Sequence, residues 1–210
     1  MRLFFLVHLI PFFIRSYCKR NAVVTLMMGT DSGFISGVVT LGQSLIEAGS
    51  KLERIVMITP DVTPETRKSL LSRWNKVIEV DYINCKFKTN PDADDMFDMK
   101  GEKWKTATTK WAPTCTKLAA WTLTSYDRII FMDSDMIAVG NVDDALYKYS
   151  NQSFLAAPET LPPDTLNSGF MVLNPSLKTF KKLLELNDDM GVAWTGMFIS
   201  ASVKCSCHDI

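Results

Sequence analysis

Short apolar runs alternate along the chain with longer segments in which apolar residues recur at helical spacing. Three runs have the length and composition of buried strands: residues 21–28, 54–59 and 77–80. Between them, residues 34–48 and 64–74 carry apolar side chains on one helical face. Thr63 is the expected N-cap of the second helix, and Pro64 occupies its first position. This alternation predicts a largely parallel sheet with right-handed crossovers.

The alternation resumes after a polar stretch, residues 81–112, that has no apolar periodicity. Three further strands are expected: residues 128–132, 154–157 and 166–173. Three further helices are expected: residues 113–121, 141–146 and 177–186. Asn141 is the expected N-cap of the helix at 141–146, and Ser176 is the expected N-cap of the helix at 177–186. Asp143 and Asp144 are expected to act as helix-dipole partners after Asn141.

The run at 128–132 ends in two carboxylates, Asp133 and Asp135, separated by Ser134. In an extended backbone the side chains at i and i+2 leave from one face, so both acids are expected to project together from the strand end. Open α/β sheets bind ligands at that edge, and paired carboxylates suit Mn²⁺ or Mg²⁺ held jointly with phosphate oxygens. Asp92 and Asp94 have the same spacing but follow no strand, so we expect them in a solvated loop.

The N-terminal segment has a different character. Arg2 precedes an apolar stretch, residues 3–14, that is interrupted by Pro11. This length is short for a membrane span but typical of the apolar region of a secretory signal. We therefore expect residues 1–18 to be a signal peptide or short membrane anchor, and the remainder to reside in the secretory pathway (ER or Golgi lumen) or outside the cell. A cytoplasmic location would follow if this segment were instead a buried first strand or helix.

Composition and charge narrow the choice of function. The 210 residues, 47% of them hydrophobic, suffice for one domain with a substantial core. Lys plus Arg and Asp plus Glu number 23 each, without a long basic run, so no nucleic acid partner is expected. The glycines Gly29, Gly33 and Gly37 do not form a Rossmann Gly-x-Gly-x-x-Gly turn, and no Gly-Lys-Ser/Thr phosphate loop is present. Neither dehydrogenase nor P-loop chemistry is expected.

The cysteines leave their pairing open. If Cys18 is removed with a signal peptide, three pairings are possible among the remaining four: Cys85, Cys115, Cys205 and Cys207. Cys205-Ser-Cys207-His208 is spaced too closely for a structural zinc site and lacks a second half. Asn151-Gln-Ser153 is an N-glycosylation sequon, which is meaningful only in a chain that enters the secretory pathway.

Four short motifs occur in an order that resembles glycosyltransferase family 8, in particular its glycogenin-like branch and the plant xylan glucuronyltransferases. They are Thr-Lys-Leu-Ala-Ala-Trp at 116–121, Phe-Met-Asp-Ser-Asp at 131–135, Asn-Val-Asp-Asp at 141–144 and Leu-Asn-Ser-Gly at 166–169. The likeness covers roughly residues 23–191. It implies an α/β, GT-A-type fold with a Rossmann-like, mostly parallel sheet flanked by helices. It also implies retaining transfer of a hexose or hexuronic acid from a UDP-sugar to a glycan or protein acceptor, with Mn²⁺ as cofactor and Mg²⁺ as the alternative.

The same resemblance implies a set of donor-binding residues. They are Thr30, Phe34, Lys117, Asp133, Ser134, Asp135, Asn167, Ser168 and Gly169. Asp133 and Asp135 correspond to the ligands of the metal and of the diphosphate and ribose, and Lys117 to a lysine that contacts the nucleotide sugar. Thr30 and Phe34 match uridine-contacting positions, where the family often has Tyr in place of Phe34. The last three residues of the set correspond to the pocket around the sugar, with Asn167 as its contact.

The chain departs from the family pattern after residue 191. The family expects an Asp-Gln pair and a His-x-x-Gly-x-x-Lys-Pro-Trp stretch, and residues 192–210 contain neither. Lys110 aligns only loosely with a family arginine, and His208 lacks any family context as a third metal ligand. We therefore expect an incomplete transferase domain at residues 19–191, lacking its C-terminal part and impaired in transfer, followed by a non-family tail.

Two other functional classes share part of this pattern. A catalytically silent nucleotide-sugar-binding module, or a partner subunit, is the alternative, and a homodimer is compatible with either. A generic nucleotidyltransferase is not supported, because no glycine-rich nucleotide loop bearing a lysine is present.

Overall fold

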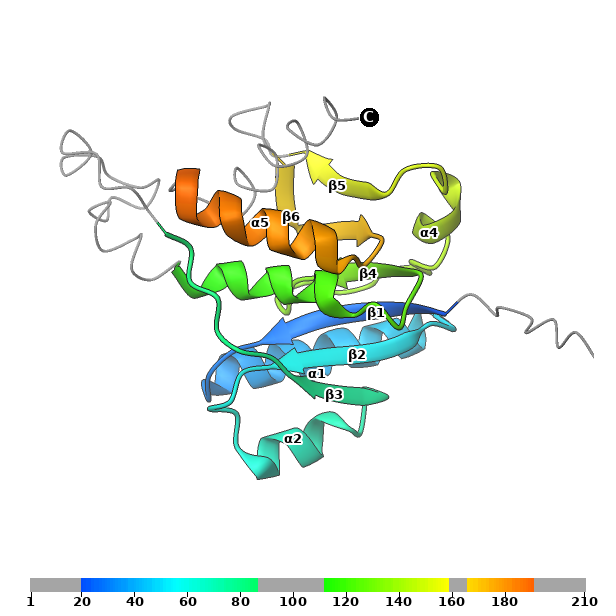
Figure 1. Cartoon of the computed structure of the whole chain (residues 1–210). Helices are drawn as coiled ribbons and strands as arrows, with labels where there is room; N and C mark the ends of the chain where they lie inside the picture. Colours follow the sequence, from blue (N-terminus) through cyan, green and yellow to red (C-terminus); the bar gives the residue numbers. More distant parts are fainter. Residues whose placement is uncertain (1–19, 87–111, 159–165, 191–210) are drawn as a thin grey trace, which may run out of the picture.

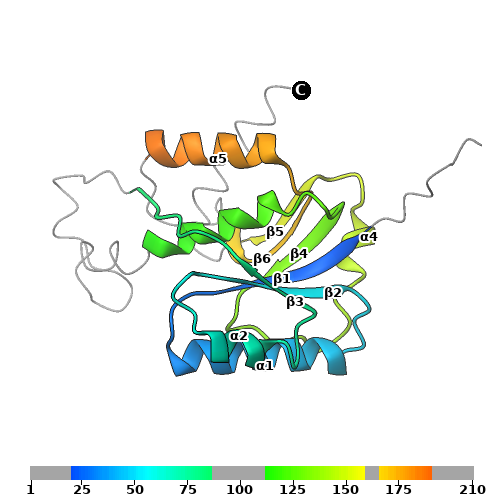
Figure 2. The same cartoon turned by 60° about the horizontal axis from the view of Figure 1, so that its bottom comes forward.

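The computed structural model describes residues 20–86, 112–158 and 166–190. Within these ranges a six-stranded sheet is covered by helices on both faces (Figures 1 and 2). The strands are β1 (Asn21–Met27), β2 (Glu53–Ile58), β3 (Lys76–Glu79), β4 (Arg128–Met132), β5 (Phe154–Pro158) and β6 (Leu166–Leu173). The helices are α1 (Ser32–Glu47), α2 (Pro64–Leu70), the 3₁₀ helix η2 (Ala112–Thr122), α4 (Ala145–Lys148) and α5 (Leu177–Met190). None of the helices in these three ranges combines the length and the apolar composition that a membrane-spanning helix needs.

Several predicted features lie outside the described residues. They are the leader at 1–18, Asp92 and Asp94, Lys110 and the tail at 192–210 with Cys205, Cys207 and His208.

The strands lie in the order β3-β2-β1-β4-β6-β5. β1 pairs in parallel with β2 and β4, and β2 with β3, whereas β6 runs antiparallel to both β4 and β5. The prediction of a mostly parallel sheet is confirmed, with β6 running against the other described strands. The chain moves outward from β1 to β3 and then crosses to β4 on the far side of β1. The carboxyl ends of β1 and β4 therefore meet at a switch point, where open sheets of this kind bind ligands.

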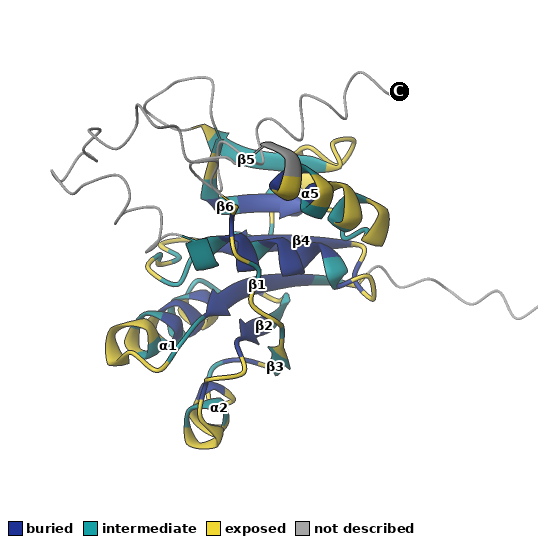
Figure 3. Ribbon diagram, turned by 60° about the vertical axis from the view of Figure 1, so that its left-hand side comes forward, coloured by how far each residue is buried: buried dark blue, intermediate teal, exposed yellow. Residues whose placement is uncertain are grey.

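Alternate strand residues feed two apolar cores, one on each face of the sheet. The core beneath the sheet in Figure 2 contains Val23 of β1 and Leu41 of α1. The core on the other face contains Val24 of β1 and Leu118 of η2. Every residue of β4 is buried, and Figure 3 shows β1 and β4 in dark blue at the centre of the sheet. An apolar run without polar alternation is what a strand covered on both faces requires.

Both of the predicted N-caps at Thr63 and Ser176 are confirmed. The Thr63 hydroxyl accepts the backbone N–H of Thr66 at 3.2 Å, and the Ser176 hydroxyl accepts that of Thr179 at 3.2 Å. Each cap satisfies a donor that the first turn of a helix would otherwise leave unpaired.

The helix predicted at 64–74 is shorter than expected, because α2 ends at Leu70. Trp74 is almost fully buried, and its indole N–H donates to the carbonyl oxygen of Val38 in α1 at 3.1 Å. The chain leaves the helix early to bring this ring into the core.

The helix predicted at 141–146 is wrong in its position and its cap. The helix of this region, α4, begins at Ala145 and has no side-chain cap from Asp144. The Asn141 side chain instead accepts the backbone N–H of Asp143 at 2.8 Å. The Asp143 carboxylate does not serve a helix terminus: it accepts the Ser50 hydroxyl at 2.6 Å and the Lys51 backbone N–H at 2.8 Å. This loop is thereby fastened to the turn that follows α1.

Candidate active site

The acidic pair follows β4 in a turn rather than in an extended strand end. The Asp133 backbone N–H donates to the Gly169 carbonyl oxygen at 2.8 Å, and the Met136 N–H returns to the Asp133 carbonyl oxygen at 3.2 Å. The prediction that an extended backbone aligns the two side chains is therefore wrong. Burial is the main cause that raises the pKa of Asp133, and the charge of Asp135 on the same turn adds to that rise.

Lys117 reaches Asp133 from η2. Its ammonium lies 2.8 Å from Asp133 Oδ2 and 3.3 Å from Ser168 Oγ, and 12% of its side chain is exposed. Burial raises the pKa of Asp133, and the Lys117 charge opposes that rise. Three residues predicted for the donor site are thus brought together from η2, from the turn after β4 and from β6.

β6 is bulged where it passes the acidic turn. The register of its pairing with β5 shifts before Ala157, which pairs with Asn167 and leaves residues 168–170 opposite no residue of β5. The Asn167 side chain accepts the Gly169 backbone N–H at 2.7 Å. A Cβ at Gly169 would lie 2.8 Å from Asn167 Oδ1 and 3.3 Å from Asp133 Oδ2. Glycine therefore permits the bulge to approach Asp133 this closely.

A pocket of about 280 Å³ opens between the first turns of α1 and the acidic turn. Its lining is Asp31, Gly33, Phe34, Gly37, Ser134 and Asp135. Asp31 caps α1 by accepting the Gly33 N–H at 2.7 Å, and 49% of Phe34 is exposed. Thr30 is exposed in the turn before α1 and does not line this pocket.

Gly37 is a site residue that the sequence did not indicate. A Cβ there would lie 2.5 Å from the backbone oxygen of Ser134, so only glycine lets α1 pass so close to the acidic turn. Gly33 precedes it by four residues and lies on the same helical face. The available signal was this four-residue spacing, which fits neither nucleotide-binding fingerprint but does fit a helix that approaches other backbone.

Two carboxylates are available for a divalent cation. In the ranges that the structure describes, no group of three or more His, Cys, Asp or Glu side chains is arranged to hold a metal ion. Mg²⁺ and Mn²⁺ nevertheless suit Asp133 and Asp135, because such hard ions take oxygen ligands and are usually bound by one or two carboxylates with substrate phosphates. The pair fits a cation that shares its coordination with a diphosphate.

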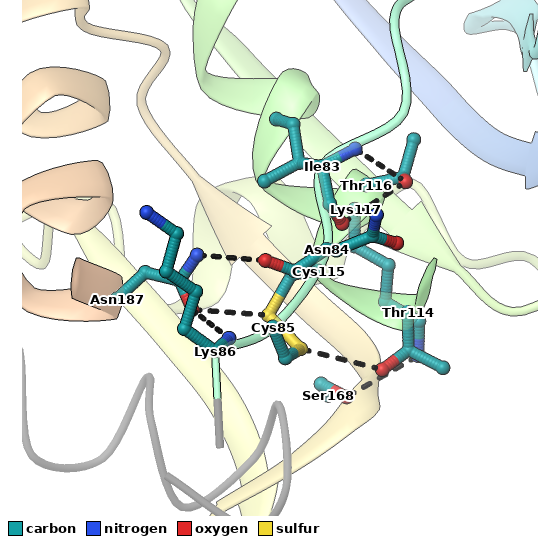
Figure 4. Close-up of a disulfide and its surroundings, with 10 residues drawn as sticks. All are labelled: Ile83, Asn84, Cys85, Lys86, Thr114, Cys115, Thr116, Lys117, Ser168 and Asn187. Atoms are coloured by element: carbon teal, nitrogen blue, oxygen red, sulfur yellow. Dashed lines mark hydrogen bonds between the residues drawn. A yellow bond between two sulfur atoms is a disulfide. The ribbon is translucent and has the colours of Figure 1, made fainter. Parts of the chain in front are cut away.

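Next to Lys117 in the chain, η2 is fastened to the segment that follows β3 (Figure 4). Cys85 and Cys115 form a disulfide, one of the three pairings that the sequence leaves open. The Thr116 hydroxyl accepts the Ile83 backbone N–H at 3.0 Å and donates to the Ile83 carbonyl oxygen at 3.3 Å. The segment carrying Lys117 is thereby held by a covalent bond and by two hydrogen bonds.

Asn187 of α5 holds the same segment from the other side. Its side chain is buried, accepts the Lys86 backbone N–H at 3.0 Å and donates to the Asn84 carbonyl oxygen at 2.9 Å. No local pattern in the sequence indicates this role, because only the folded sheet brings residue 187 beside residues 84–86.

The region that contains this site matches a known protein family. The family model described as Glycosyl transferase family 8 matches residues 25–195. Human glycogenin-1 is 32% identical over 171 residues, which are 81% of this chain and 44% of glycogenin-1. Human glycogenin-2 is 35% identical, over 79% of this chain and 30% of its own length. A putative UDP-glucuronate:xylan alpha-glucuronosyltransferase 5 of Arabidopsis thaliana is 29% identical, over 79% of this chain and 25% of its own. The chain thus spans less than half of each of these relatives.

Solved structures agree on the fold. The glycosyltransferase GlyE of Streptococcus pneumoniae TIGR4 superposes with a TM-score of 0.58 at 16% identity, over 89% of this chain and 43% of GlyE. The galactosyltransferase LgtC, solved with donor and acceptor sugar analogs, gives 0.57 at 10% identity, over 87% of this chain and 70% of LgtC. Identities this low speak for the fold alone, and they confirm the predicted GT-A-type architecture. The family model and the glycogenin relatives show that this chain is a glycogenin-like member of glycosyl transferase family 8.

Proposed function

We propose that this chain binds a UDP-sugar together with Mn²⁺, or Mg²⁺ in its place, and that the protein transfers the sugar with retention to a glycan or protein acceptor. The donor sugar is a hexose or a hexuronic acid. One observation carries the proposal: Lys117, Asp133 and Ser168 converge beside a pocket that Asp135 and Phe34 line. Positive, negative and aromatic groups are then available for the phosphates, the cation and the base of one ligand.

Asp133 and Asp135 would hold the cation. When bound, the ion offsets the negative charge that develops on the departing UDP. In this structure, the Lys117 ammonium forms an ion pair with the Asp133 carboxylate. Because the ammonium is already confined by η2, it can donate to a phosphate oxygen of the donor with little further loss of side-chain entropy.

The two sides of the acidic turn offer different surfaces to the rest of the donor. Phe34 presents an exposed aromatic ring in the pocket, which suits stacking on a uracil base. Asn167, Ser168 and Gly169 lie on the β6 bulge, and we assign them to the sugar. Thr30 lies near the start of α1, outside the pocket lining, so its contact with uridine depends on how far the base extends.

A catalytically silent nucleotide-sugar-binding module, or a partner subunit, is the second candidate. It is supported by the same geometry, because Lys117, Asp133 and Ser168 beside the pocket can hold a UDP-sugar without any residue being assigned to the transfer step. Such a module would pair with an active subunit or with a second copy of the chain. We assign no residue to the face of the sugar opposite UDP.

We place the protein in the lumen of the secretory pathway or outside the cell, with residues 1–18 as signal or anchor. The buried Cys85–Cys115 disulfide supports this location, because disulfides persist in oxidising compartments and are rare in the cytosol.

Titration calorimetry with UDP tests the donor site. Binding is expected with Mn²⁺ present and is expected to disappear with a chelator or with Asp135→Asn. Asp144→Asn is the matched control, because Asp144 is exposed and forms no capping hydrogen bond. Equal affinity with the chelator would refute the shared cation. Sugar transfer or hydrolysis measured with UDP-glucose and UDP-glucuronic acid then separates an enzyme from a silent module.

A further inference from the structure

The turn between α4 and β5 carries a motif that the donor site does not use. Asn151, Gln152 and Ser153 are all exposed there. The Gln152 backbone N–H donates to the Tyr149 carbonyl oxygen at 3.1 Å, which closes a four-residue turn with Asn151 at its third position. A turn of this kind presents its central side chains to solvent.

The buried side chain of Arg128 holds the backbone of this turn. Its Nη2 donates to the carbonyl oxygens of Tyr149 at 3.0 Å and of Gln152 at 2.8 Å. On the other side of the turn, the Asn174 backbone N–H donates to the Ser153 carbonyl oxygen at 3.0 Å. These hydrogen bonds use inward-facing backbone groups, so the fold fixes the path of the turn without involving the Asn151 side chain.

The turn lies at the end of the sheet opposite the candidate active site. Arg128 is the first residue of β4, and Asp133 follows its last. A strand of five residues spans about 16 Å. A bulky group on Asn151 would therefore grow away from the donor pocket.

We propose that Asn151 is an N-glycosylation site of the native protein. The co-reactant is a lipid-diphosphate-linked oligosaccharide. The Asn151 amide nitrogen forms a bond to C1 of the first sugar as the bond from C1 to the diphosphate oxygen breaks. The lipid diphosphate leaves with the electron pair, and the amide proton passes to a base of the transferring enzyme. The inference rests on the lumenal location proposed above, which the buried disulfide supports independently of the motif.

The sequence contains a built-in negative control for this proposal. Asn174-Pro175-Ser176 has the sequon spacing, but proline at the middle position blocks modification. No other Asn in the 210 residues is followed two positions later by Ser or Thr. A single glycan is expected, and its position is fixed.

A glycan at this position would also protect the sheet. β5 is the last strand of the described sheet order, and unpaired strand edges are prone to pair with other chains. Tyr147 and Tyr149, just before the motif, are 60% and 50% exposed. A hydrated oligosaccharide at Asn151 covers this surface and disfavours association through it.

The test expresses the full chain in eukaryotic cells and treats it with peptide N-glycosidase. We expect one glycosidase-sensitive band shift, and conversion of Asn151 to Asp at the released position in peptide mass spectra. Asn151→Gln and Ser153→Ala should abolish the shift, whereas Ser153→Thr and Asn174→Gln should retain it. Affinity for UDP with Mn²⁺ should be the same with and without the glycan.

A parallel arm places a known cleavable secretory leader before the full chain. A chain that lacks the glycan in both arms overturns the site, because the motif has then been exposed to the transferring enzyme without being modified. A chain glycosylated only behind the added leader overturns the proposal for the native protein and its lumenal location together, and leaves the donor-site proposal untouched.

Discussion

Lys117 and Asp135 belong to neighbouring parts of the candidate site, but their segments are held in place in different ways. On the lysine side, η2 is tied to the segment after β3 by the Cys85–Cys115 disulfide and by the Thr116 hydroxyl. On the acidic side no covalent bond helps. The acidic turn and the loop after it lie along α1 and touch it at successive points.

These contacts follow the helix from one end to the other. Gly37 abuts the Ser134 carbonyl, and the Ser44 hydroxyl accepts the Ala138 backbone N–H at 2.9 Å. Beyond the helix, Asn141 donates to the Gly49 carbonyl oxygen at 3.2 Å, and the Asp143 carboxylate binds the next turn. Many small contacts act in parallel here, so losing one weakens the support without removing it. The lysine side adds one covalent bond to its hydrogen bonds, and that covalent bond depends on redox conditions.

The largest effect is expected from breaking the disulfide. Cys115→Ser should lower the free energy of unfolding by about 2–4 kcal/mol, because the cross-link joins residues 30 positions apart and restricts the unfolded chain. UDP affinity should fall with it, since η2 carries Lys117. Urea unfolding with and without reductant measures the first effect and calorimetry the second.

Cys85→Ser serves as the matched variant and should give the same loss. Wild-type protein in reductant should approach both variants, whereas the variants themselves should not respond to reductant. A wild-type protein that is insensitive to reductant would show that the disulfide does not support the lysine side.

The next effect is expected from closing the gap between α1 and the acidic turn. Gly37→Ala places a Cβ 2.5 Å from the Ser134 oxygen, so the helix or the turn must shift, at about 1–3 kcal/mol. An alanine in an open helix position would instead stabilise by about 0.5–1 kcal/mol. Because Ser134 adjoins both acids, Mn²⁺-dependent UDP binding should weaken at least about tenfold.

Gly140→Ala is the control for this change, since nothing lies within 4 Å of a Cβ there. It should leave binding unchanged. A Gly37→Ala protein that is as stable and binds as well as the Gly140→Ala protein would mean that α1 does not position the acidic turn.

The sequence predicted the sheet better than the site, and the reason is physical. The apolar run that forms β4 indicates a strand buried on both faces. The bounds of β6 were predicted to the residue. Local signals also located the Thr63 and Ser176 caps. Helix α2 was overextended because Trp74 has helical spacing, yet its ring is needed in the core.

Site geometry escaped prediction wherever it depended on contacts between distant segments. The acids were expected on an extended strand, but the turn at Asp133 is set by pairing with Gly169 on β6. The disulfide partner of Cys85 could not be chosen from spacing. Gly37 looked like a failed nucleotide fingerprint, because its neighbour Ser134 is remote in the sequence.

A smaller effect is expected at the far end of the acidic-side support. Asp143→Ala removes the acceptor of the Ser50 hydroxyl and the Lys51 N–H, which should cost about 1–3 kcal/mol of stability. Binding of UDP should fall less than for Gly37→Ala, because the other contacts along α1 remain. Asp144→Ala, one residue on and exposed, should stay within about 0.5 kcal/mol of wild type in urea unfolding. Equal losses of stability for the Asp143→Ala and Asp144→Ala proteins would show that the Asp143 carboxylate does not stabilise this loop.

The smallest effect concerns pH and returns to the lysine side. Burial holds the pKa of Asp133 above its usual value of 3.8, and the Lys117 charge limits that rise. An acid whose folded-state pKa is raised binds its proton more tightly when folded, so stability falls as the pH rises from the unfolded pKa through the folded one. Lys117→Met removes the opposing charge, raises the pKa of Asp133 further, and should extend this decline to higher pH.

Urea unfolding measured from about pH 4 to neutrality compares the two slopes directly. Asp133→Asn in the Lys117→Met background should abolish the added pH dependence, because the titrating group is gone. If the added slope persists in the double variant, another group titrates, and the ion pair is not what couples η2 to the acidic turn. If the added slope disappears, Lys117 is the electrostatic partner of Asp133. The segment held by the disulfide and the turn held by α1 are then coupled through this one ion pair.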